Sequence, residues 1–230
     1  MEDLAKSSLA TGSTREGDEA AWLRAVLVFN LSPAVYADVS WLPPEVPGVE
    51  SSRAARRQLS EALISEHGLD DCFDWSMNDP VLRPMLLSPQ SWSELALTVG
   101  VLAHRNRLRQ VVQRELSSQW QALLGARMDL LWTPLADRVP AIGAQTKPAP
   151  SPEAVRAIHD DGQAVILGLL NLRHDFAHAN VMRRAQLRLP RTRLLDPLAW
   201  QPEVMYADAL AHSLMDDLLP RRSPEWTWLS

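Results

Sequence analysis

The chain has 230 residues, of which 46% are hydrophobic, which is enough to bury one substantial core. Its 23 basic and 28 acidic residues give a formal net charge of −5, which argues against nucleic acid as the main partner. Cys72 is the only cysteine, so we expect neither a disulfide framework nor a cysteine metal site. The start of the chain lacks the features of a signal peptide, and no apolar run approaches the roughly 20 residues that span a bilayer. These features predict a soluble cytoplasmic protein without direct membrane insertion.

The helical pattern begins after a polar segment. Residues 1–17 contain Ser, Thr and Gly without periodicity, and we expect them to form a flexible tail. Apolar residues then recur at helical spacing in residues 18–29. A further helix is expected to start at a serine cap, Ser51 or Ser52, and to end at Gly68 in a left-handed conformation.

Residues 88–112 are the stretch around which the chain is expected to be organised. Serine followed by proline is a helix start signal, and the segment that follows is apolar on two sides. One stripe contains Trp92, Leu95, Ala96, Val99, Leu102 and Ala103. The opposite side carries Leu97 and Val101, so the helix must be covered on both faces. The stripe stops at Arg105 and Asn106, which predicts a break near Asn106 and a second, amphipathic helix after it.

The second half of the chain contains a partner for this helix. Residues 133–152 are rich in proline and predict an internal loop. From Ser151, a cap followed by proline, a helical pattern with two apolar sides continues to Ala185, and residues 201–219 predict a last helix. Strand signals are nearly absent. We therefore predict an all-α fold, a single compact multi-helix domain with two central buried helices and a flexible N-terminal tail.

The paired histidines of the sequence HDFAH are the residues most suggestive of catalysis. His174 and His178 share a helix face at the spacing that grips zinc, with Asp175 between them. Asp175 is shorter than the glutamate that such sites use, and no third ligand follows at a characteristic spacing. A degenerate metal phosphohydrolase pattern also links His159 and Asp160 to this motif. The main expectation for this motif is two partly buried histidines held by polar neighbours, with no metal and no cofactor. A metal-dependent hydrolase that uses His174 and His178 is kept as an alternative.

Two basic clusters, residues 53–57 and 105–109, have another set of interpretations. They are typical of a solvated helix face or of a surface that docks an acidic protein, and arginines also contact phosphates.

Four blocks of the sequence lie in order at residues 29–43 (beginning FNLSPAVY), 86–112 (containing SELALTVGVLAHRNRLRQVV), 187–190 (LRLP) and 212–220 (HSLMDDLLP). Together these blocks resemble the YscK/SctK family of type III secretion proteins. The resemblance implies that residues 18–230 form one all-helical, non-enzymatic adaptor domain. Such an adaptor belongs to the sorting platform at the cytoplasmic face of the bacterial inner membrane. It links the cytoplasmic domain of the inner-membrane ring protein SctD to the pod protein SctQ.

The adaptor hypothesis predicts partner-binding residues. We expect the arginine cluster Arg105, Arg107 and Arg109 to make one contact, because charged rims set orientation and association rate. Trp226 and Trp228 are expected to anchor a second contact, as aromatic residues often do. A secretion chaperone, which binds secreted substrates instead of a ring protein, is the remaining alternative.

Overall fold

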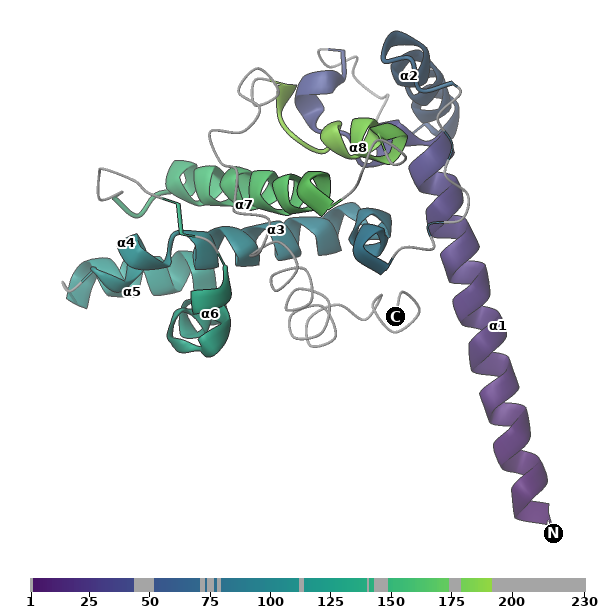
Figure 1. Ribbon diagram of the computed structural model, residues 1–230, viewed down its shortest axis with the longest axis horizontal. Coiled ribbons are helices and arrows are strands. Elements are labelled where there is room, and N and C mark those ends of the chain that lie inside the picture. The colour runs from purple at the N-terminus through teal and green to yellow at the C-terminus, as the bar shows by residue number, and fades with distance from the viewer. Residues whose placement is uncertain are drawn as a thin grey trace.

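The fold is described from a computed structural model that covers residues 2–43, 52–70, 73, 77, 80–111, 114–139, 141–142, 149–173 and 179–191. Within these ranges every regular element is helical and no strand occurs (Figure 1). The elements are α1 (Glu2–Leu31), η1 (Pro33–Val35), η2 (Val39–Trp41), α2 (Arg53–Glu66), η3 (Pro80–Leu86), α3 (Pro89–Ala103), α4 (Arg105–Arg109), α5 (Arg114–Leu124), η4 (Gly125–Trp132), α6 (Pro134–Arg138), α7 (Pro152–Arg173) and α8 (Ala179–Gln186), where η denotes a 3-10 helix. The predicted all-α class is confirmed.

The helix boundaries follow the local signals in the sequence. The side chain of Ser88 accepts a hydrogen bond from the N–H of Ser91 at 3.3 Å and caps α3. Ser52 caps α2 in the same way. Gly68 has a φ of +59°, in the left-handed region that favours glycine, and it terminates α2. The predicted caps at both ends of α2 are therefore confirmed.

The centre of the molecule is an antiparallel pair formed by α3 and α7 (Figure 1), which make the most extensive contact between any two described elements. The two backbones approach unusually closely at two glycines. A Cβ atom on Gly162 would lie 1.9 Å from the carbonyl oxygen of Ala96, and one on Gly100 would lie 1.9 Å from that of Ile158. Only glycine therefore fits at these positions, and the pair is locked in one register.

α3 is buried on both of its apolar sides, as its sequence predicts. The main stripe joins a large core cluster with residues of α1, η3, α7 and α8. Val101 belongs to a second, smaller cluster, and Leu97 packs against it. The buried members of the second cluster are Val101, Leu108, Trp120, Leu124, Leu131 and Ile158. α3 thus separates two hydrophobic cores.

The break expected near Asn106 is confirmed, whereas one predicted loop differs from the structure. α3 ends at Ala103 with His104 as its cap, and α4 begins at Arg105. The side chain of His104 is buried and its Nε2 bonds to Asp161 of α7 at 2.9 Å, which draws the turn toward α7. The segment predicted as a Pro-rich loop contains the short helix α6, because Pro134 occupies a first helical position.

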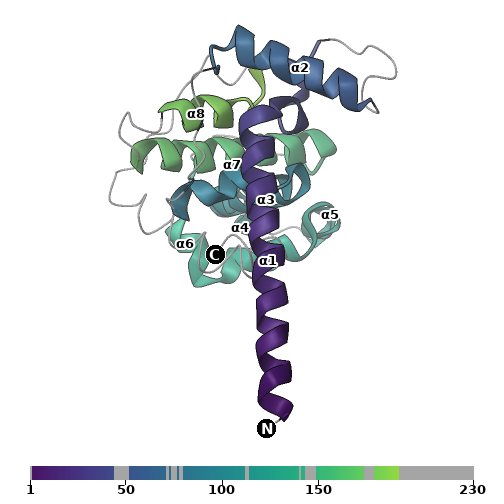
Figure 2. The same ribbon diagram turned by 90° about the vertical axis from the view of Figure 1, so that its right-hand side faces the viewer.

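The ends of the chain add detail to the prediction. The N-terminal segment of α1 projects away from the body (Figure 2), consistent with the predicted tail, and it is helical from Glu2. The pattern expected to continue from Ser151 to Ala185 is divided between α7, which ends at Arg173, and α8, which does not continue the axis of α7 (Figure 1). The helix predicted at 201–219 lies outside the described residues.

Candidate interaction surface

A buried arginine joins the sequence blocks on which the family resemblance rests. The guanidinium of Arg188 lies between the rings of Tyr36 and Trp92, at 4.9 and 4.7 Å from their centroids. Its Nη2 donates hydrogen bonds to the carbonyl oxygens of Met85 at 2.8 Å and Leu87 at 3.0 Å. Blocks 29–43, 86–112 and 187–190 therefore meet at one side chain.

Main-chain hydrogen bonds extend this junction. The N–H of Asp38 donates to the carbonyl oxygen of Leu187 at 2.7 Å. The indole N–H of Trp41 donates to the carbonyl oxygen of Leu189, also at 2.7 Å. Since these residues satisfy each other's polar groups, the blocks hold the fold together at the end of the molecule where α1, α2 and α8 meet.

Tyr36 completes the junction. Its ring stacks on Phe29 with 5.4 Å between centroids, and its hydroxyl donates to the carbonyl oxygen of Phe29 at 2.9 Å. Burial raises the pKa of Tyr36 to about 12, although the positive charges of Arg188 and Arg184 act in the opposite direction.

At the other end of the α3–α7 pair, Arg105 and Arg107 contact groups of their own chain. The guanidinium of Arg105 donates to the carbonyl oxygen of Val139, and its side chain is only 12% exposed. The Nη1 of Arg107 lies 3.3 Å from Nδ1 of His104. Burial lowers the pKa of both arginines, while Asp137 raises that of Arg105. These two arginines are thus partly withdrawn from solvent.

Arg109 is tied to the neighbouring turn. Its Nε donates to the carbonyl oxygen of Leu131 at 2.8 Å, and its Nη1 lies 3.3 Å from Oδ1 of Asp137. Its guanidinium also lies over the ring of Trp132, 5.5 Å from the centroid. Trp132 itself is 72% exposed. Sequence reasoning missed Trp132 as an aromatic contact residue, although its place just before the Thr133 and Pro134 start signal was a usable sign of exposure.

Exposed apolar side chains occur at both ends of the α3–α7 pair. On α1, Leu23, Leu27 and Leu31 recur at every fourth residue and face solvent. Val39, in η2 beside the Arg188 junction, is 74% exposed. Trp132, the last residue of η4, lies beside Arg109 of α4 at the opposite end. Exposed apolar residues that lie together, as the three leucines of α1 do, are typical of surfaces that bind other proteins, whereas single exposed residues are common.

The histidines of the described residues form contacts between or within helices. Nε2 of His159 lies 3.0 Å from Oγ of Ser93, and its Nδ1 lies 3.3 Å from Oδ1 of Asp160, which joins α7 to α3. Ser93 beside His159 does not form a nucleophile site of the serine-hydrolase kind. It lies within a continuous helix, where the backbone N–H groups bond to earlier carbonyl oxygens and are not free to bind an oxyanion. His174 and His178 lie outside the described residues. Among the described residues, no group of three or more His, Cys, Asp or Glu is placed to hold a metal ion.

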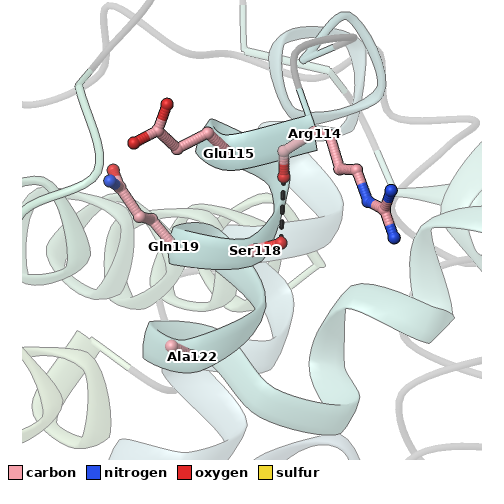
Figure 3. A pocket seen from close by; sticks show the side chains of 5 residues that line it. All are labelled: Arg114, Glu115, Ser118, Gln119 and Ala122. Carbon is pink, nitrogen blue, oxygen red and sulfur yellow. Dashed lines mark hydrogen bonds between the residues drawn. The ribbon is translucent and has the colours of Figure 1, made fainter.

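A hollow of about 570 Å³ lies along α5 (Figure 3). It is lined by Arg114, Glu115, Ser118, Gln119 and Ala122. All five residues come from one helix, and Ser118 Oγ donates to the carbonyl oxygen of Arg114 at 2.9 Å. Ligand sites bring polar groups together from several elements, so this hollow does not define one.

No protein-family model, curated protein or solved structure matches this chain. In the part of the chain that the structure describes, no helix is both long enough and apolar enough to cross a membrane. Trp226 and Trp228, the other predicted anchors, lie outside the described residues.

Proposed function

We propose that the protein is a non-enzymatic adaptor of a type III secretion sorting platform, which links the cytoplasmic domain of the ring protein SctD to the pod protein SctQ. One observation carries the proposal beyond the sequence resemblance. Residues of blocks 29–43, 86–112 and 187–190, far apart in the chain, meet around Arg188. Residues that contact one another in the fold depend on one another's chemistry. The presence of all three blocks in one chain therefore supports a fold shared with the family over a chance similarity of sequence.

The architecture supports a linking role. The α3–α7 pair is held by backbone contact at Gly100 and Gly162, where there is no side chain to repack. Exposed apolar residues lie at both ends of this pair. A stiff body with a contact surface at each end fixes the distance between two partners, which is what an adaptor within an ordered assembly requires.

The contact residues follow from this arrangement. Trp132, stacked with Arg109, is proposed as a contact at the α4 end, and the exposed leucines of α1 as a contact at the other. Trp226 and Trp228 remain proposed anchors. In this account the protein is held at the cytoplasmic face of the inner membrane through SctD and does not insert into the bilayer.

Affinity purification of the tagged full-length protein from its native host tests the proposal. The adaptor hypothesis predicts that SctD and SctQ co-purify. Recovery of secreted substrates without a ring protein would instead identify a chaperone. A stoichiometric bound metal that is lost in a His174→Ala variant would identify a metal-dependent enzyme and overturn the proposal.

A further inference from the structure

α2 presents an exposed group of arginines at its N-terminal end. Arg53, Arg56 and Arg57 are all exposed, and their spacing places them on one side of the helix. Further along the same face, Ser60, Leu63 and Ile64 are buried and fix the helix to the body, so this face is exposed only in the first turns of α2. Figure 2 shows α2 at the outer edge of the molecule. We call Arg53, Arg56 and Arg57 the α2 arginine patch.

This patch is electrostatically unfavourable within the chain itself. The N-terminus of a helix carries partial positive charge and prefers acidic side chains, whereas α2 has none in its first turn. Arginines three and four residues apart on a helix also repel one another. Arg57 pairs with Glu61 at 2.8 Å, but Arg53 and Arg56 form no ion pair within the described part of the chain. The patch therefore has unused capacity for negative charge.

The arginines of α4 differ from those of α2 in their contacts. Arg105 and Arg109 donate to carbonyl oxygens of their own chain, while the guanidinium groups of Arg53 and Arg56 have no such acceptor among the described residues. Arg105 and Arg109 thus already have acceptors within the chain, whereas the guanidinium groups of Arg53 and Arg56 are available to a partner.

We propose that the α2 arginine patch is a docking surface for a carboxylate-rich segment of a protein partner. The planar guanidinium group binds carboxylates through paired hydrogen bonds, which favours arginine over lysine at such a surface. An extended anionic surface such as a bilayer or a nucleic-acid duplex must also approach the rest of a chain whose net charge is −5. A short acidic segment contacts α2 alone. Identifying this segment with a sorting-platform partner rests on the proposed function.

The test uses the full-length protein and a fluorescein-labelled peptide of about ten glutamates, followed by fluorescence anisotropy at about 50 mM and about 300 mM NaCl. The expected result is binding that weakens with salt and that falls at least about tenfold in the Arg53→Glu/Arg56→Glu variant. The matched control is Arg24→Glu/Arg183→Glu, which makes the same change in net charge at two other exposed arginines. It is expected to retain most of the binding.

Three results would overturn the inference. The first is equal peptide binding by the patch variant and the wild type, and the second is an equal loss of binding in the control. The third is retention of the protein by phosphatidylserine vesicles without binding to the peptide, which would assign the patch to phosphate. Because the peptide assay contains no secretion protein, its failure is distinguishable from a failure of SctD and SctQ to co-purify.

Discussion

Replacement of Gly162 by alanine tests the contact that defines the centre of the fold. The new methyl group would lie 1.9 Å from the carbonyl oxygen of Ala96 and 2.6 Å from the backbone nitrogen of Gly100. Ordinary van der Waals contact begins at 3.4 Å, so the two helices must separate by about 1.5 Å at this point. Both obstacles are backbone atoms, which cannot move aside as a flexible side chain does.

The size of the effect follows from two opposing terms. Overpacking of a core costs up to about 3 kcal/mol, and a backbone clash belongs at the upper end of that range. Alanine gains about 1 kcal/mol over glycine in a helix interior. The expected result is a loss of about 2 kcal/mol in the free energy of unfolding, or about 6 °C in Tm for a domain of this size. Urea denaturation followed by circular dichroism measures it.

The same substitution at Gly17 provides the control. Gly17 also lies in a helix, α1, but a Cβ atom there meets nothing within 4 Å. The Gly17→Ala variant is therefore expected to be at least as stable as the wild type. A Gly162→Ala variant that matches the wild type in stability would refute the close α3–α7 contact. Combining Gly162→Ala with Gly100→Ala should cost less than the sum of the two, because one separation of the helices relieves both clashes.

Three further predictions concern the arginines and the buried tyrosine. The Arg188→Met variant is expected to lose about 3 kcal/mol in urea unfolding, since two main-chain carbonyls lose a charged donor. Because the pKa of Tyr36 is raised from 10 to about 12 in the folded protein, the neutral phenol contributes about 3 kcal/mol to the free energy of unfolding below pH 10. This contribution is lost as the pH rises to about 12, so the Tyr36→Phe variant should lose less stability at alkaline pH than the wild type. Equal losses in the two proteins would contradict this. Charge reversal at Arg105 and Arg109 should lower Tm, whereas reversal at Arg53 should not, and equal Tm values in thermal melts would argue against the internal contacts of α4.

Local signals and hydrophobic periodicity predicted much of this fold. The two apolar sides of residues 88–103 correspond to two separate hydrophobic clusters, because a helix that divides two cores needs both faces covered. Serine caps and the left-handed Gly68 act within a few residues, so the sequence alone locates them. The register of α3 against α7 was not predictable, because it depends on Gly100 and Gly162 meeting the opposite backbone. In the sequence, each glycine indicates only a residue that is unfavourable within a helix.

Long-range contacts explain what sequence reasoning missed at the candidate interaction surface. The sequence predicts Arg105 and Arg109 on a solvated helix face or as contacts to a partner, but it does not show that they also donate to carbonyl oxygens of later segments, such as that of Val139. Arg188 likewise gives no local sign that it is buried between two aromatic rings. Tertiary packing decides which groups these side chains contact, and hydrophobic periodicity carries no information about such contacts.

We propose that this protein physically connects SctD to SctQ. The direct measurement is retention of purified SctQ on immobilised SctD cytoplasmic domain, with and without the full-length protein. The account predicts that SctQ is retained only when the protein is present, and that the protein binds each partner separately. Retention of SctQ that is unchanged by the protein, or binding of the protein to neither partner, would contradict it.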